Sequence, residues 1–238
     1  MNAGCRTAAL APITILAGAC APRPTTAGGR EIERLYDIFS VIAAIVFIVT
    51  AGLILWSMLR YRRKRADDAL PRQTHTNVAL EVVWFAIPQL IVVGLFVLSV
   101  QTLGRVDEPP AEAGAAPLVV EVEGFQWGWR FSFPDAGVTV TGIAQDDPVV
   151  VLPVDVPIVF ELASRDVIHS FYVPRFLTKR DVVPGHDNAL TITIEEEGVY
   201  EGKCAEFCGL LHAEMNFEIR AVPEEEFRTW LEEVARGE

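Results

Sequence analysis

Two long uncharged stretches constrain this chain more than any other feature of its sequence. Residues 38–59 and 82–103 each run for 22 residues without a charged side chain. About 20 apolar residues span the hydrocarbon core of a bilayer. Both stretches are therefore predicted to form transmembrane helices, at about residues 36–60 and 80–104. Pro88 in the second stretch is tolerated where a neighbouring helix covers the freed carbonyl.

The charges around these stretches predict an orientation in the membrane. The connection between them is rich in basic residues, and basic connections usually face the cytoplasm. The basic residues are Arg60, Arg62, Arg63, Lys64, Arg65 and Arg72. Both ends of the chain are then expected outside. From residue 105 onward, 10 Lys and Arg oppose 26 Asp and Glu, so this segment carries −16. Such an acidic domain suits solubility, and it also suits a basic protein partner.

The first residues of the chain resemble a targeting segment. Residues 1–19 contain one basic residue, an apolar stretch and small residues before Cys20. This pattern predicts a secretory signal peptide. The sequence that precedes Cys20 is also close to the cleavage box of bacterial lipoproteins. We therefore expect a bacterial plasma-membrane protein whose external domain lies on the outer face.

The segment after the second helix is expected to form an all-β external domain. Short apolar or alternating runs such as "LVVEVEGF", "VTVTGI" and "NFEIRAV" are separated by turn residues. Many short strands at this spacing predict an antiparallel sandwich or barrel. The last segment begins at Pro223, has an acidic first turn and carries apolar residues at helical spacing. We find no glycine loop for phosphate and no basic patch interleaved with aromatics, which argues against a nucleic-acid partner.

The stretch "KCAEFCGLLHAEM" concentrates residues that are scarce elsewhere in the chain. It places Cys204, Cys208, His212 and Met215 at intervals of four, four and three. This spacing is compatible with a disulfide in an oxidising compartment, with a zinc site, or with one face of a helix. It is also compatible with copper, since soft sulfur ligands with imidazole favour copper or zinc over magnesium or calcium.

A second histidine adds to this set. His169 lies in the strand-like run "DVIHSFYVP", 35 residues before Cys204. A lone histidine in such a run is usually a satisfied core residue, and here it becomes a candidate ligand from a neighbouring strand. Four Cys and His ligands still satisfy zinc. Met215 favours copper, because a thioether is a common weak ligand of electron-transfer copper.

With these residues, the chain resembles subunit II of the haem-copper cytochrome c oxidases. The runs that carry the resemblance are "LEVVW", "FQWGWRF", "DVIHSFYVP", "DVVPG" and "CAEFCGLLHAEM". The resemblance implies a membrane-anchored all-β protein, in which a two-helix hairpin precedes a cupredoxin-like Greek-key β-barrel and a short C-terminal helix. It also implies the binuclear copper centre called CuA. The implied ligands are His169, Cys204, the backbone carbonyl of Glu206, Cys208, His212 and Met215.

The resemblance implies three further roles. Trp127 would be the point where an electron enters from cytochrome c, although from the residues alone it is more simply a half-buried sandwich aromatic. The Glu206 side chain would bind a magnesium shared with subunit I. Glu81 would lie at the entrance of a proton pathway, although an interfacial charge at a helix end explains it equally well.

The resemblance also implies a function. The chain would be the electron-entry subunit of a terminal oxidase, an enzyme complex that reduces oxygen to water and pumps protons. It would accept electrons from cytochrome c and pass them to haem in subunit I. The alternatives are the CuA subunit of a haem-copper nitric oxide reductase, a membrane-anchored copper-delivery protein and a disulfide-bearing adhesion domain.

The chain is thus expected to divide into six segments. These are a signal peptide (1–19), an N-terminal segment (20–34), the transmembrane hairpin (35–104), a linker (105–117), the cupredoxin CuA domain (118–222) and the C-terminal helix (223–238).

Overall fold

The computed structural model describes residues 23–62, 73–107 and 117–237. The signal peptide expected over residues 1–19 and the cysteine at position 20 lie outside these ranges. Most of the basic connection and most of the expected linker lie outside them as well. The chain divides into two compact units, one of which holds Arg34–Gln101, while the other combines Pro22–Glu33 with Thr102–Glu238.

Two long helices precede the β-domain in sequence. α2 spans Ala27–Arg60 and α3 spans Val78–Asp107, and both are long and apolar enough to cross a membrane. Their apolar stretches are not buried within the chain, as a lipid-facing surface requires. α2 begins well before the expected start near residue 36, because the Thr26 hydroxyl accepts the N–H of Gly29 at 3.0 Å and caps the helix.

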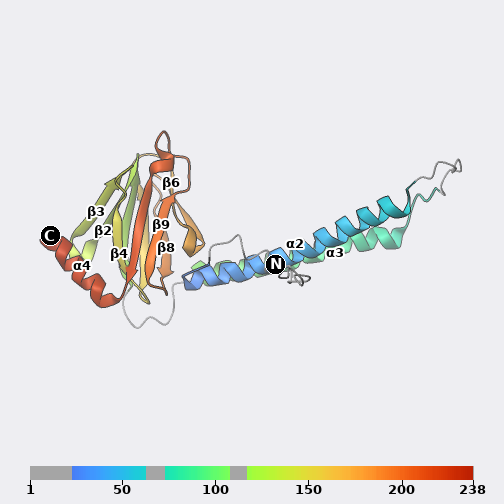
Figure 1. The fold of residues 1–238 in the computed structure, drawn as a ribbon, viewed down its shortest axis with the longest axis horizontal. Helices are drawn as coiled ribbons and strands as arrows, with labels where there is room; N and C mark the ends of the chain where they lie inside the picture. Colours follow the sequence, from blue (N-terminus) through green and yellow to red (C-terminus); the bar gives the residue numbers. More distant parts are fainter. Residues whose placement is uncertain (1–22, 63–72, 108–116, 238) are drawn as a thin grey trace, which may run out of the picture. The chain divides into compact units, whose positions relative to one another are not determined.

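The ten described strands form two five-stranded sheets that stack as a sandwich (Figure 1). In spatial order, the first sheet contains β3 (Val138–Ile143), β2 (Gly128–Phe133), β1 (Leu118–Phe125), β5 (Pro157–Ser164) and β8 (Asn188–Thr193). In the same manner, the second sheet contains β4 (Val149–Pro153), β10 (Asn216–Val222), β9 (Gly198–Cys204), β6 (His169–Val173) and β7 (Thr178–Val182).

Aromatic side chains from both sheets fill the space between them. Trp129 and Phe131 from β2 meet Phe171 from β6 and Phe217 from β10, and all four are buried. The rings of Phe171 and Phe217 stack with centroids 4.8 Å apart. Aromatic pairs of this kind add to the free energy gained by burying their area. Gly202 on β9 leaves room for the ring of Phe217.

The predicted architecture of two apolar helices, a β-sandwich and a C-terminal helix is confirmed. α4 (Glu224–Arg236) buries Phe227 and lies beside β3 and β4 (Figure 1). Most strand pairs are antiparallel as expected, but β1 pairs with β5 and β4 pairs with β10 in parallel. Each of these pairs joins strands whose connection passes through the opposite sheet, which permits parallel pairing. β7 was not predicted, because "TKRD" lacks apolar residues and lies on a sheet edge.

The residues just before α2, together with its first turn, pack onto the sandwich. We call residues 23–31 the N-terminal strap. Thr25 donates its N–H to the Arg175 carbonyl at 3.1 Å and accepts the N–H of Glu195 at 2.9 Å. Thr26 forms an antiparallel bridge with Ile194. Both threonines are buried, so the strap is an integral part of this compact unit.

Replacing Gly202 by alanine is expected to destabilise the sandwich. A Cβ at this position would collide with the buried ring of Phe217. Overpacking of this kind typically costs about 1–3 kcal/mol. The free energy of unfolding, measured by chemical denaturation, should fall by this amount. Val199→Ala on the same strand should change it little, because Val199 is largely exposed. Equal stability of the two variants would contradict the packing described here.

Candidate metal centre

The scarce sulfur and imidazole residues lie in the loop that joins β9 to β10. We call residues 204–215 the ligand loop. The N–H of Cys204 donates to the carbonyl of Met215 at 2.9 Å and closes the loop at its base. Inside the loop, the N–H of His212 donates to the carbonyl of Gly209 at 3.2 Å. The loop contains only one short 3-10 turn and no α-helix, so the interpretation of its spacing as a helical face is wrong.

His169 reaches the ligand loop from the neighbouring strand. It is the first residue of β6, which pairs with β9 so that Phe171 lies opposite Cys204. A further hydrogen bond, from the N–H of Ala205 to the carbonyl of Ser170 at 3.0 Å, continues this pairing into the loop. The Nδ1 atom of His169 lies 3.9 Å from the sulfur of Cys204. Strand pairing therefore brings together residues that are 35 positions apart.

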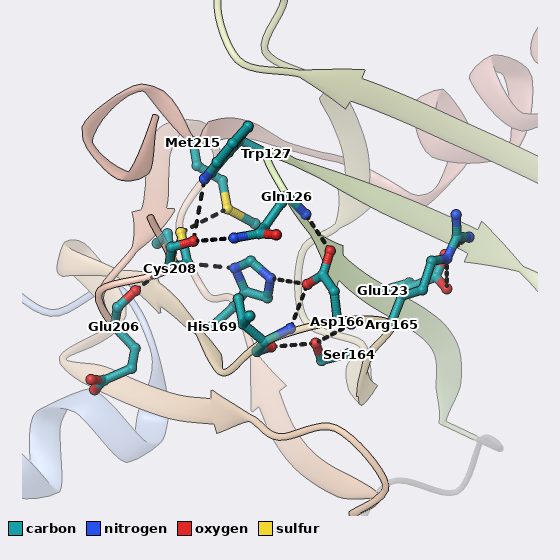
Figure 2. A network of polar contacts seen from close by, with 12 residues as sticks. Glu123, Gln126, Trp127, Ser164, Arg165, Asp166, His169, Glu206, Cys208 and Met215 are labelled. Atoms are coloured by element: carbon teal, nitrogen blue, oxygen red, sulfur yellow. Dashed lines mark hydrogen bonds and ion pairs between the residues drawn. The ribbon is translucent and has the colours of Figure 1, made fainter. Parts of the chain in front are cut away.

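The remaining donor atoms gather around the two sulfurs, and Figure 2 shows Met215 and Glu206 beside Cys208. The sulfurs of Cys204 and Cys208 are 3.8 Å apart. Nδ1 of His212 lies 3.6 Å and the sulfur of Met215 lies 3.7 Å from the sulfur of Cys208. The thiol of Cys204 donates to the backbone carbonyl of Glu206 at 3.2 Å. All six residues expected as copper ligands thus present donor atoms to one small volume.

The chemistry and burial of these donors fit a copper site. His169, Cys204, Cys208 and Met215 are each at most 5% exposed, and three of them present ligand atoms within 4.8 Å of one another. A disulfide requires sulfurs about 2.05 Å apart, whereas both cysteines here are free. Two thiolates, two imidazoles and a thioether are soft donors that suit copper, and a site made only of protein ligands suits electron transfer.

The two thiols differ in their tendency to ionise. Burial disfavours the Cys204 thiolate, but hydrogen bonds with His169 and the backbone outweigh burial and lower the pKa of Cys204 to about 6. Burial and the neighbouring Cys204 thiolate raise the pKa of Cys208 to about 12. Burial also disfavours a charged His169, yet hydrogen bonds with Cys204 and Asp166 raise the pKa of His169 above its usual value. One thiolate is therefore stabilised without a metal, and a second is not.

Asp166 and Gly124 hold the imidazole of His169 from its far side. The Nε2 atom of His169 lies 2.8 Å from Oδ1 of Asp166, which leaves Nδ1 directed at the sulfur. Carboxylates commonly orient metal-binding histidines in this way. A Cβ at Gly124 on β1 would lie 3.1 Å from Cδ2 of His169, so the glycine lets the ring rest directly against the first sheet.

Trp127 contacts the ligand loop directly. Its ring is half-buried, and its Nε1–H donates to the carbonyl of Cys208 at 3.3 Å. Gly209 adopts φ +122°, and a Cβ there would lie 3.2 Å from Nε1 of Trp127. The glycine thus satisfies an unusual backbone conformation and also lets the indole approach. Trp129 is fully buried and donates to the carbonyl of Met215 at 3.4 Å, so the two tryptophans contact opposite parts of the loop.

Two expected acidic residues lie apart from the donor cluster. The Glu206 carboxylate points away from the sulfurs (Figure 2) and lies 3.9 Å from the ammonium of Lys179. Glu81 lies in the first turn of α3, where its carboxylate accepts the N–H of Asn77 at 3.3 Å. Asn77 in turn accepts the N–H of Leu80 at 3.2 Å, so the two side chains form a reciprocal helix cap.

Sequence analysis alone did not identify Gln126 or Gly124 as part of this site. The side-chain amide of Gln126 donates to the carbonyl of Cys208 at 2.7 Å. Gln126 lies within the aromatic run "FQWGWRF" and Gly124 immediately precedes it, so their closeness to Trp127 was the available signal. Asp166 lies three residues before His169, but the sequence did not indicate that the two side chains form a hydrogen bond.

Comparisons with known proteins agree with this arrangement. The family described as "Cytochrome C oxidase subunit II, periplasmic domain" matches residues 138–222, and "Cytochrome C oxidase subunit II, transmembrane domain" matches residues 19–102. Cytochrome c oxidase subunit 2 of Alkalihalophilus pseudofirmus is 38% identical over 86% of this chain and 59% of its own length. A probable cytochrome c oxidase subunit 2 of Nocardia farcinica is 34% identical over 91% of this chain and 74% of its own length.

A solved structure resembles the β-domain. The periplasmic domain of subunit II of cytochrome oxidase from Bradyrhizobium japonicum aligns with a TM-score of 0.50 and 31% identity. The alignment covers 55% of this chain and 99% of that domain. The chain spans 59% of the length of the A. pseudofirmus relative, so that protein has additional sequence that this chain does not match.

In the metal-free, reduced chain, one thiolate should form at unusually low pH. Because the pKa of Cys204 is lowered to about 6 and that of Cys208 is raised to about 12, Cys204 is the one of these two thiols that ionises between these values. The ultraviolet absorbance of thiolate, titrated with pH, should show a step near pH 6 that Cys204→Ser abolishes. A curve without the step near pH 6, in which Cys204→Ser removes absorbance only near the ordinary value of 9.0, would contradict this electrostatic description.

Replacing Asp166 by asparagine should weaken copper binding. The variant loses the charged acceptor that orients His169, and such losses typically cost about 10- to 100-fold in metal affinity. Competition with a chelator of known affinity measures the effect. Asp135→Asn is the matched control, because Asp135 lies in the turn between β2 and β3, away from the donors. Unchanged affinity in Asp166→Asn would show that the backbone alone fixes the imidazole.

Proposed function

This chain belongs to the cytochrome c oxidase subunit II family, and we propose that it is the electron-entry subunit of a terminal respiratory oxidase. In this function it accepts electrons from cytochrome c at a binuclear copper centre and passes them to haem in subunit I. Reduction of oxygen to water, coupled to proton pumping, takes place in subunit I.

Family membership also indicates where the chain acts. It is a membrane-anchored protein with an outer-face domain, and other oxidase subunits are its partners. We propose the bacterial plasma membrane as its location, supported by the basic connection between the helices and by the acidic segment after residue 105.

One observation carries the proposal: two buried free thiols lie 3.8 Å apart among two imidazoles, a thioether and a carbonyl. We propose that these groups hold the two coppers, with thiolates from Cys204 and Cys208 and imidazoles from His169 and His212. Met215 and the Glu206 carbonyl complete the set. Copper in such a site would supply one-electron redox chemistry. The buried positions of His169, Cys204, Cys208 and Met215 exclude water and limit the movement of the donors.

Trp127 is proposed as the entry point for the electron. Its indole bridges the domain surface and the ligand loop through the Cys208 carbonyl. The surface around it is acidic, which would attract a basic cytochrome c. Asp166 bonds the neighbouring Gln126 N–H, while Glu214 bonds Gln145 in the loop whose Ala144 N–H donates to the Trp127 carbonyl. Arg165, the basic residue next to Asp166, is paired with Glu123 at 2.7 Å.

Two further roles are proposed for acidic side chains. The Glu206 carboxylate faces away from the copper donors and is free to contribute to a magnesium site completed by subunit I, where it would exchange its contact with Lys179. Glu81 starts α3, at the end of that helix nearest the basic connection, which suits a proton-pathway entrance on the cytoplasmic side.

The full-length chain, purified in detergent and loaded with copper, should bind two coppers. Paramagnetic resonance should show a single unpaired electron shared over both nuclei, because the closely spaced thiolates of Cys204 and Cys208 would let both coppers share it. The ratio of copper to protein and the hyperfine pattern measure this directly. A single copper or a zinc ion per chain would contradict the proposed function.

Trp127→Phe should slow electron entry from reduced cytochrome c while the copper spectrum stays unchanged, because the donor atoms are untouched. Stopped-flow absorbance measures the rate. Trp230→Phe on α4 is the matched control and should react like the unmodified chain, since Trp230 packs on Phe133 and Phe227. An unchanged rate in Trp127→Phe would remove the proposed role of this residue.

A further inference from the structure

The copper donors and their closest hydrogen-bond partners come from different sheets. His169 begins β6 and the ligand loop follows β9, and both strands belong to the second sheet. Gln126 lies in the turn between β1 and β2, which belong to the first sheet. The position of this turn therefore fixes the donors relative to the opposite layer of the sandwich.

The side chain of Gln126 makes the shorter of two hydrogen bonds to one carbonyl. Its Nε2 lies 2.7 Å from the carbonyl oxygen of Cys208, compared with 3.3 Å for Nε1 of Trp127 (Figure 2). A Cβ at residue 209 would lie 3.1 Å from Nε2 of Gln126, so Gly209 is needed for this close approach as well. One carbonyl thus accepts both donors, and its residue carries a sulfur of the donor cluster.

The backbone of Gln126 contacts the other side of the cluster. Its N–H donates to Oδ2 of Asp166 at 2.7 Å, and Oδ1 of the same carboxylate lies 2.8 Å from Nε2 of His169. One residue therefore connects to a cysteine through its side chain and to a histidine through its backbone. The two connections reach the cluster from separate directions (Figure 2).

We propose that Gln126 is a positioning residue that holds the Cys208 segment against the His169 segment and raises the reduction potential of the copper centre. This proposal rests on the proposed function. Hydrogen bonds around a metal's ligands tune its affinity and its potential. The side-chain amide of Gln126 directs the positive end of its N–H dipole at the backbone of Cys208, the residue that carries the thiolate. A positive end near the site stabilises the reduced form, which carries one more electron.

Substitutions of the side chain separate its contribution from that of the backbone. Gln126→Leu keeps similar bulk and removes the donor, while Gln126→Glu puts a carboxylate beside the carbonyl of Cys208. The bond from the residue 126 N–H to Asp166 persists in both variants. In the full-length, copper-loaded chain, the reduction potential should therefore fall in the order unmodified, Gln126→Leu, Gln126→Glu.

The same variants should lose copper faster. Losing one hydrogen bond worth about 1 kcal/mol corresponds to an approximately fivefold faster release of copper to a chelator. Gln145→Asn is the matched control, because that exposed amide bonds to Glu214 and contacts no donor residue. It should keep the potential and the release rate of the unmodified chain.

The possible results are distinct. A falling potential with two coppers still bound supports the positioning role. Unchanged potentials in Gln126→Leu and Gln126→Glu, or an equal shift in Gln145→Asn, would overturn it while the proposed function stands. If the unmodified chain fails to bind two coppers, the proposed function itself fails, and this outcome is visible before any variant is measured.

Discussion

The proximity of two buried thiols is the constraint on which the rest of the site depends. The sulfurs of Cys204 and Cys208 lie 3.8 Å apart, so a thiolate on Cys204 strongly disfavours ionisation of Cys208. The raised pKa of Cys208 reflects this repulsion together with burial. Near neutral pH a bound metal cation favours deprotonation of both thiols, because metal binding releases the protons of its ligands. The surrounding structure follows from this need: donors such as His169 stabilise the first charge, and the Asp166 carboxylate supports that imidazole without approaching the sulfurs.

The two sheets of the sandwich contribute different residues to the site. The second sheet carries the donor residues at the ends of two paired strands, where the backbone is held by its neighbours. The first sheet contributes the turn of Gln126 and Trp127, whose side chains both donate hydrogen bonds to the carbonyl of Cys208. Because the ligand loop and this turn are both anchored by paired strands, the donor atoms have little freedom to move. Little movement is what fast electron transfer requires.

Sequence patterns predicted the parts that depend on residue type, and they failed where partners far apart in sequence decide. Uncharged length predicted both helices, alternation predicted most strands, and scarce sulfur residues with His169 predicted the donor set that the fold brings together. The parallel pairing of β1 with β5 was not predictable from alternation, since period two is the same in either direction. The position of Gln126 beside a tryptophan did not assign its amide to the site, because the hydrogen-bond partner lies 82 residues away in the ligand loop.

The N-terminal strap means that the folded β-unit is assembled from two separate pieces of the chain. Arg30 pairs with Glu195, and Gly29 fits so tightly against the Phe176 carbonyl that a side chain would clash there. A soluble fragment that begins after α3 would lack this piece and would expose the backbone of residues 175 and 194–195 to water. Producing the β-unit alone therefore calls for joining residues 23–31 to the C-terminal half by a short artificial connection. The fragment then keeps the backbone partners of residues 175 and 194–195.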